Sequence, residues 1–354
     1  MLWQWPTKNH LPQAMACSES GSHMFVALKD GGLAVLDIRD TDGPREVARI
    51  SIDDFGRLHA MNLALDGDRL LVALGDFFGR KSKAGLAVVS IRAPAAPRVL
   101  GVWMSDAELK GAADVAGSGK IAYLGAMTEG VISLDISDPR RIQHLATFQP
   151  DVHFPRRNPG PVQHPNARGL ALQGNLLYLA NDAGGLRVVD VRNPRRPREV
   201  GRYINGAMGD KQQAYNNVVI YGRRALLAVD YAGLEIVDIS NPGEIQQVGW
   251  WNPWEAHTLK NLWFNSPGHT NQLLLDRRGR SVFMSAGDSE LQVVDITDPT
   301  RPRLRAAFGQ PKNGRGVWGL TEADGRIYLG YIKTVVPFRG TWSGVEVVEI
   351  SQAR

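Results

Sequence analysis

Histidine side chains are concentrated in the long connections between the predicted strands. Imidazole titrates near neutral pH and binds divalent metal ions, so these residues are the first candidates for acid–base chemistry. Four of them are candidate catalytic residues of a hydrolase or a lyase, each working with a nearby carboxylate: His59, His164, His257 and His269. The alternative, which we prefer, is that they form a polar, hydrated rim.

A divalent metal ion is a second option for two of these histidines. His59 and His269 stand at matching positions in two repeats, just before a predicted inner strand, and they are the candidate metal ligands. The sequence contains no HExxH motif and no paired CxxC motif, which are the local spacings that most strongly indicate metal. A metal therefore stays an alternative, and no other cofactor is expected.

Aromatic and arginine side chains in the same connections indicate a binding surface. Such side chains bury a large area at a low cost in conformational entropy, which is typical of recognition sites. The candidate binding residues are Trp254, Trp263, His153, Arg156, Arg157, Arg315 and Trp318. The neighbouring Trp250 and Trp251 are explained equally well by packing inside the fold.

The connections separate seven copies of one sequence pattern. The copies are GGLAVLDIRD from Gly31, AGLAVVSIRA from Ala84, EGVISLDISDP from Glu129, GGLRVVDVRNP from Gly184, AGLEIVDISNP from Ala232, SELQVVDITDP from Ser289 and SGVEVVEIS from Ser343. They recur every 45 to 57 residues or so, which is too long for leucine-rich or ankyrin repeats and matches a four-stranded propeller blade. Three further β-rich runs accompany each signature in a fixed order, with Gly, Asp, Asn and Pro at the turns. The pattern predicts an all-β, seven-bladed β-propeller of four-stranded antiparallel blades, as a single domain over residues 1–354.

The signature also resembles the repeat of the LVIVD family of bacterial β-propellers. That repeat has Gly-Leu, alternating apolar residues, Asp-Ile-Ser, Asn or Asp, and then Pro, and the match is closest in 185–194, 233–242 and 291–299. The second copy departs from it at Ser90, and the last copy ends at Glu349 without a proline turn. The resemblance implies a seven-bladed propeller and a scaffold role, without naming a ligand.

The two chain ends predict how the ring closes. The seventh copy has no fourth strand, whereas the chain begins with LWQWP, which resembles QVGWW of the fifth copy. We expect Leu2 to Trp5 to supply the missing strand, because pairing the two ends removes an exposed sheet edge.

Carboxylates that recur at the ends of the signatures have a structural explanation. Asp135, Asp190, Asp238 and Asp295 each precede a Ser-Asp-Pro, Asn-Pro or similar turn. A carboxylate at that position accepts hydrogen bonds from turn amides, so we interpret these residues as turn caps and not as a metal ring.

Connections longer than a blade needs indicate where function lies. The strand order places the long connections between blades on one face of the ring, around the mouth of the channel. We expect a ligand-binding or protein-binding scaffold that uses this face, with a protein partner preferred and a carbohydrate or peptide as alternatives. An enzyme is the less favoured reading.

Composition excludes several other classes. With 43% hydrophobic and 22% charged residues, and no apolar run long enough to cross a bilayer, the chain is typical of a globular protein without a transmembrane segment. No nucleic-acid partner is expected, because the arginine-rich turns lack interleaved stacking aromatics. The N-terminus carries no secretory signal, so the localisation stays open between the cytoplasm and export with a trimmed leader.

Overall fold

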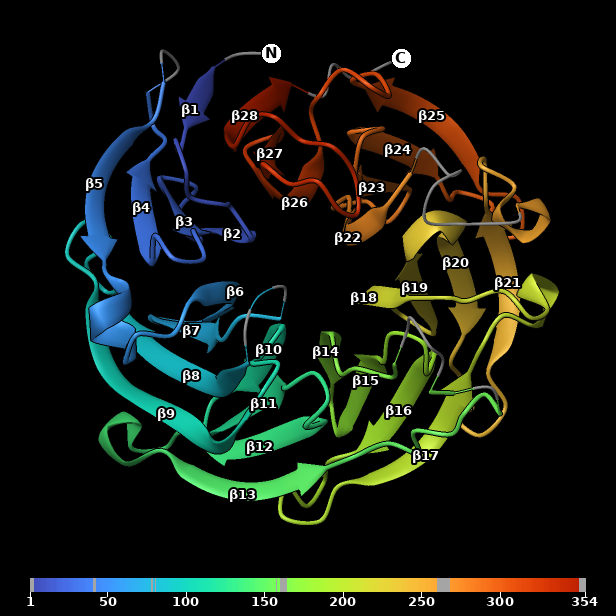
Figure 1. The fold of residues 1–354 in the computed structure, drawn as a ribbon, viewed down its shortest axis with the longest axis horizontal. Coiled ribbons are helices and arrows are strands. Elements are labelled where there is room, and N and C mark those ends of the chain that lie inside the picture. The colour runs from blue at the N-terminus through green and yellow to red at the C-terminus, as the bar shows by residue number, and fades with distance from the viewer. Residues whose placement is uncertain are drawn as a thin grey trace.

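The chain folds into a ring of four-stranded antiparallel sheets (Figure 1). The computed structural model describes residues 3–40, 43–77, 79, 81–156, 158–159, 164–259 and 268–349. Within these residues there are seven sheets, and the strands run outward from the centre in sequence order, except that β1 is the outermost strand of the last sheet. The predicted seven-bladed β-propeller is therefore confirmed.

The strands of each blade follow the order that the repeat predicts. Blade one contains β2 (Ala14–Cys17), β3 (His23–Ala27), β4 (Leu33–Asp37) and β5 (Arg45–Ile50); blade two contains β6 (Ala60–Asp66), β7 (Arg69–Leu74), β8 (Ser82–Ser90) and β9 (Arg98–Leu109). Blade three contains β10 (Asp114–Ser118), β11 (Ile121–Gly125), β12 (Val131–Asp135) and β13 (Gln143–Phe148); blade four contains β14 (Gly169–Gln173), β15 (Leu176–Ala180), β16 (Leu186–Asp190) and β17 (Arg198–Tyr203). Blade five contains β18 (Tyr215–Tyr221), β19 (Arg224–Val229), β20 (Gly233–Asp238) and β21 (Gln246–Trp251); blade six contains β22 (Thr270–Leu275), β23 (Ser281–Ala286), β24 (Leu291–Asp295) and β25 (Arg303–Phe308). Blade seven contains β26 (Val317–Ala323), β27 (Arg326–Tyr331), β28 (Gly344–Glu349) and the N-terminal β1 (Gln4–Pro6).

The N-terminal strand closes the ring, as predicted. Strand β1 pairs with β28, with Gln4 opposite Glu346 and Pro6 opposite Gly344. The strand lies slightly later than expected, although the amide of Val347 still donates to the carbonyl of Trp3 at 3.2 Å. Residue 2, the first of the predicted strand, lies outside the described residues.

The hydrophobic core lies between neighbouring blades. The largest cluster joins blades four and five through fully buried side chains such as Leu186, Val188, Leu227 and Val237. Alternate residues of each middle strand face the two neighbouring blades, so both faces of those strands are apolar. Burying each such side chain contributes about 1.5–3 kcal/mol, and the blades therefore stabilise one another around the ring.

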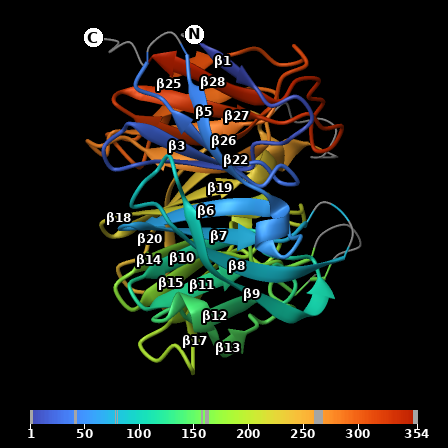
Figure 2. The ribbon, with the colours of Figure 1, turned by 90° about the vertical axis from the view of Figure 1, so that its left-hand side faces the viewer.

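The ring has two different faces, which Figure 2 shows edge-on. We call the loop face the one that carries the connections between blades and the turns between second and third strands. It includes the short 3₁₀ helices η1 (Ile52–Phe55), η3 (Gly206–Met208), η4 (Asp230–Ala232) and η5 (Ala256–Thr258). The turn face carries the remaining turns and η2 (Pro139–Arg141). No helix in the described part of the chain is long and apolar enough to cross a membrane.

The signature aspartates cap turns on the turn face, as predicted. The carboxylates of Asp135, Asp190, Asp238 and Asp295 accept the amide N–H two residues further on, at 2.9, 3.0, 2.7 and 2.9 Å. Hydrogen bonds to the ionised form favour it, so the pKa of each of these carboxyls is lowered. These residues are structural.

Candidate functional site

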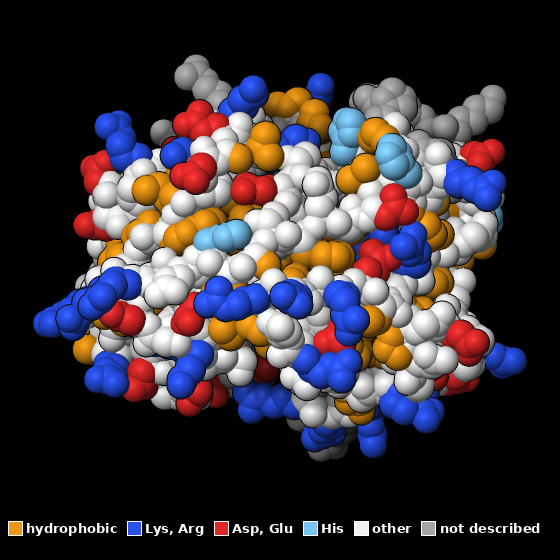
Figure 3. Space-filling model, turned by 90° about the horizontal axis from the view of Figure 1, so that it is seen from below, with side chains coloured by type: hydrophobic (Ala, Val, Ile, Leu, Met, Phe, Trp, Pro, Cys, Tyr) orange, Lys and Arg blue, Asp and Glu red, His pale blue; other side chains and the backbone are white. Residues whose placement is uncertain are grey.

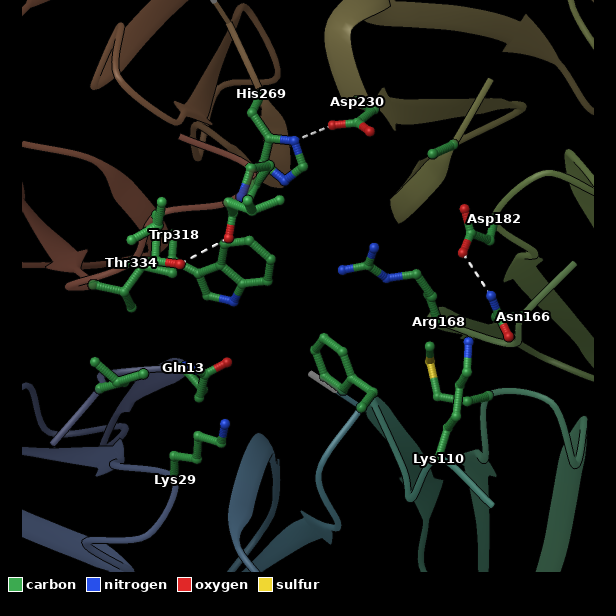
Figure 4. A pocket seen from close by; sticks show the side chains of 18 of the residues that line it. Gln13, Lys29, Lys110, Asn166, Arg168, Asp182, Asp230, His269, Trp318 and Thr334 are labelled. Atoms are coloured by element: carbon green, nitrogen blue, oxygen red, sulfur yellow. Dashed lines mark hydrogen bonds and ion pairs between the residues drawn. The ribbon is translucent and has the colours of Figure 1, made fainter. Parts of the chain in front are cut away.

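A cavity of about 620 Å³ opens at the channel mouth on the loop face. Its volume is in the range of small-molecule binding sites. Much of the lining comes from two positions in the repeat, the residues just before the inner strand and those just after the second strand. Gln13, Arg168 and His269 occupy the first position, and Lys29, Asp182 and Asp230 the second. Because equivalent positions of all blades converge on the axis, residues far apart in sequence meet here (Figure 4).

Three cationic side chains extend into the cavity (Figure 4). The guanidinium of Arg168 donates to Asn271 Oδ1 at 3.4 Å and lies over the ring of Phe77, 5.3 Å from its centroid. Lys29 Nζ is 3.1 Å from a carboxylate oxygen of Asp76. Across the described ranges, neither Arg168 nor Lys110 has a carboxylate within 4.0 Å. The mouth thus carries two cations without an ion-pair partner in the described chain.

Two buried acids also line the cavity, Asp182 on the same side as Arg168 and Lys110, and Asp230 beside His269 (Figure 4). Asp182 accepts a hydrogen bond from Asn166 Nδ2 at 2.8 Å. Burial raises the pKa of the Asp182 carboxyl to about 6, although the charge of Arg168 opposes this shift. Asp230 forms an ion pair with Nδ1 of His269. This pair is a carboxylate and an imidazole held together at the wall of the cavity.

The ring of His269 is fixed by aromatic neighbours. It stacks on Trp318 with the centroids 5.6 Å apart and an interplanar angle of 20°, and Tyr231 meets it at 5.4 Å. Only 4% of His269 is exposed. With Nδ1 facing Asp230, the imidazole has one orientation, which is what a general acid or base needs.

Several buried polar atoms at the cavity have no hydrogen-bond partner in the part of the chain that the structure describes. They are both amide atoms of Gln13, Oδ1 of Asn166 and Nε2 of His269. Gln13 is only 2% exposed. A buried polar group without a partner costs free energy, so native proteins rarely leave several together. All three residues line the cavity.

Comparison with known proteins identifies the repeat. The family model described as "LVIVD repeat" matches residues 13–50, 111–142, 165–205, 214–251 and 282–308. The chain belongs to the LVIVD-repeat family. Blades two and seven, whose signatures depart from the motif, lie outside the matched segments of this LVIVD-repeat protein.

Solved structures share the fold at low sequence identity. The chain is similar to the WD40 repeats of RRP9 (TM-score 0.67, 13% identity, 98% of this chain and 96% of that chain). It is also similar to U3-55K (TM-score 0.67, 13% identity, 98% of each chain). The designed protein Ika8 is similar over 98% of this chain and 100% of that chain (TM-score 0.56, 14% identity). No curated protein matches the LVIVD-repeat chain in sequence.

The four candidate catalytic histidines do not form one cluster in this LVIVD-repeat propeller. His164 and His269 both line the cavity. His59 does hold the position equivalent to His269, but its Nδ1 faces Asp76 at 3.3 Å. His257 is exposed in η5, where it contacts Asn252. Within the described residues, no group of three or more His, Cys, Asp and Glu side chains is arranged to hold a metal ion.

The candidate binding residues are distributed over the loop face. Trp318 lines the cavity, whereas Trp254 packs against Trp251 with centroids 5.6 Å apart. Arg315 pairs with Glu346 in blade seven. His153 and Arg156 are exposed in the connection after β13. Trp263 and Arg157 lie outside the described residues. In Figure 3 the visible histidines occupy the upper half of the view, and lysine and arginine side chains line its lower edge.

Sequence reasoning missed most of the polar lining of the cavity. Gln13, Lys110, Arg168, Asp182 and Asp230 were not expected there. An alignment of the residues that follow each second strand would have shown that two of these polar residues stand at equivalent positions. Asp182 and Asp230 follow β15 and β19 at nearly the same distance as Lys29 follows β3.

Proposed function

We propose that this LVIVD-repeat propeller is a binding scaffold that holds a ligand or a protein partner at its loop face, with the cavity at the centre. The observation that carries this proposal is that three residues lining the cavity, Gln13, Asn166 and His269, have buried polar atoms without a partner in the described chain. A bound molecule that hydrogen-bonds to them would offset the cost of burying them. The similarity to WD40 repeats supports the scaffold fold alone.

Backbone conformation supports the same proposal. Lys29, Met127 and Asp182 occupy equivalent positions after the second strand, with φ of +54°, +50° and +46°. Glycine adopts this conformation without a penalty, and blade six has Gly287 there, with φ of +56°. Non-glycine side chains in such a conformation are strained by about 1 kcal/mol or more. All three side chains line the cavity, which gives a functional reason for tolerating that strain.

The rim of the cavity indicates a binding partner that is larger than the cavity itself. Val335 and Val336, in the connection after β27, are 74% and 67% exposed and line the mouth. Exposed apolar side chains are unfavourable in water, so covering these two valines with the apolar surface of a partner would stabilise the complex. The rim therefore fits a peptide or protein whose tip enters the channel mouth.

Site-specific photocrosslinking in the native host tests the proposal. A benzophenone amino acid at Val336 is expected to give a specific adduct. The matched control places the same group at Arg196, which is exposed on the turn face. Equal adducts from both positions, or an adduct from Arg196 alone, would contradict binding at the loop face.

A second candidate function is a hydrolase or a lyase. The observation that favours it is the ion pair of Asp230 with His269, since a carboxylate that orients an imidazole is a common acid–base arrangement. A metal-dependent version predicts about one equivalent of a divalent ion in the purified protein, lost in His269→Gln. Metal analysis of both proteins checks this, and protein without stoichiometric metal would leave only the metal-independent version.

A further inference from the structure

The chemical class of the ligand can be inferred from the charges of the cavity. Arg168 and Lys110 reach into it with no carboxylate within 4.0 Å in the described residues, although both charges act on the nearby Asp182 carboxyl, and Lys29 shares Asp76 with His59. A guanidinium and an ammonium that line one cavity attract an anion, and the planar guanidinium fork matches a carboxylate or a phosphate. The cavity therefore favours a negatively charged group at this wall.

The buried acids limit how much negative charge the cavity accepts. Asp182 is held by Asn166 and Asp230 by His269, so both carboxylates stay at the wall. Their field opposes a second negative charge on a ligand, because like charges repel strongly where water is excluded. A monoanion such as a carboxylate fits this balance better than a dianionic phosphate.

The remaining wall is apolar. Trp318 is only 3% exposed, and it lines the cavity with Phe77, Leu11 and Ile332. Burial of an apolar body against these side chains stabilises a complex by about 25 cal/mol per Å². Gln13 lies on the same side of the cavity as Lys29 (Figure 4).

We propose that the cavity binds a single carboxylate carried on an apolar body, with the carboxylate between Arg168 and Lys110 and the apolar body against Trp318. This inference rests on the binding function proposed above. The carboxylate belongs either to a small organic acid or to the C-terminus of an apolar peptide, because the two present the same chemistry to the cavity.

Calorimetric titration with matched acids and amides tests the inference. The small-molecule pair is indole-3-propionate and indole-3-propionamide, and the peptide pair is acetyl-Leu-Val-Phe with a free C-terminus and with an amidated one. In at least one pair the acid is expected to bind about tenfold or more tightly than the amide, because replacing the carboxylate with an amide removes a charge-assisted hydrogen bond. Binding of the small acid alone identifies a small-molecule ligand, and binding of the peptide acid alone identifies a C-terminus.

Three variants locate the carboxylate. Arg168→Gln is expected to weaken acid binding about tenfold or more, and Lys110→Gln by a smaller factor because Lys110 is exposed. Arg196→Gln, on the turn face, is the matched control and should bind as the wild type does. Thermal melts establish that each variant is folded, and Lys110→Gln carries the test if Arg168→Gln is unstable.

The outcomes separate this inference from the proposed function. Equal binding of acid and amide would overturn carboxylate recognition while leaving a ligand site at the mouth. No binding of any of the four probes, together with a specific crosslink at Val336, would also overturn it while the loop face remains a binding surface. Absence of both binding and crosslink would overturn both proposals.

Discussion

The two faces of the propeller hold their charged side chains in different ways, and strand β16 shows one example at each end. At the loop-face end, Arg187 is fully buried and donates to Glu199 at 2.9 Å and to the carbonyls of Gly184 and Asp151 at 2.8 and 2.9 Å. At the turn-face end, Asp190 accepts the amide and the side-chain N–H groups of the exposed Arg192. Arg187 is held in part by a segment 36 residues away, whereas Asp190 is held by its own turn.

The signature aspartates of the turn face show the same contrast with the buried polar groups of the loop face. They bond to amides two positions along the chain, so each repeat specifies these contacts, although Asp66 on the same face also accepts the amide of Gly119. On the loop face, Asn166 and Asp182 are 16 residues apart, and Arg187 and Asp151 are 36 apart. Burial raises the pKa of several loop-face acids, whereas hydrogen bonding lowers it for the turn-face aspartates. The repeat specifies the aspartate caps of one face, and contacts particular to this chain hold buried polar groups of the other.

The largest expected effect on the free energy of unfolding comes from replacing the buried Arg187. Arg187→Met leaves Glu199 and the carbonyls of Gly184 and Asp151 without this donor, and removing one partner of a buried ion pair costs about 3 kcal/mol or more. The free energy of unfolding, measured by urea denaturation, should fall by that amount. The control is Arg192→Gln at the other end of the same segment, where no measurable change is expected. Equal losses in the two variants would contradict the difference between the faces.

A buried acid under the loop face gives the next largest effect. Glu235 is fully buried and accepts hydrogen bonds from Asn205 Nδ2 at 2.7 Å and from the Tyr215 hydroxyl at 2.9 Å. Burial raises the pKa of Glu235 to about 7, so the folded chain keeps this proton at a pH where the unfolded chain has lost it. Its contribution to stability is complete below the unfolded pKa of about 4.3 and is lost as the pH rises through about 7.

Glu235→Gln tests this pH dependence, because the amide keeps an acceptor for Asn205 and does not titrate. Between pH 4 and pH 8 the stability of the variant relative to the wild type should rise by on the order of 3 kcal/mol. Urea denaturation at several pH values measures the difference, and groups common to both proteins cancel. Parallel curves for the two proteins would contradict the raised pKa.

The sequence predicts the fold well because the fold is local and repeated. The seven signatures and their turn-capping aspartates determine the blades and are visible within single repeats, and the unmatched chain ends determine the closure. The loop-face connections were also recognised, because their length exceeds what a blade needs. These properties depend on neighbours in the chain and so can be deduced from sequence alone.

The site is less predictable because its contacts join separate blades. Both His269 and Trp318 were candidates, but no local pattern shows that Asp230 faces His269 or that Arg168 enters the cavity. Trp254 illustrates the opposite difficulty, since an aromatic side chain in a long loop can pack inward, as it does against Trp251. Which side chains meet at the cavity depends on how the fold brings equivalent positions of different blades together, and no single repeat shows this.

The smallest effect is expected on the turn face, where a cap is local and exposed to water. Asp295→Ala removes the acceptor for the Thr297 amide and should lower the free energy of unfolding by about 1 kcal/mol near neutral pH. The pKa of Asp295 is lowered, because the side chain and the amide of Thr297 bond to its ionised form, so its contribution is present above the unfolded pKa and is lost as the pH falls through the folded pKa. The slope is thus opposite in sign to that of Glu235. Asp295→Asn keeps an acceptor oxygen and should lose less stability than Asp295→Ala at pH 7. If the effect of Asp295→Ala instead grew as the pH fell, the turn-face aspartates would not be charge-assisted caps, and the division between the two faces would have to be redrawn.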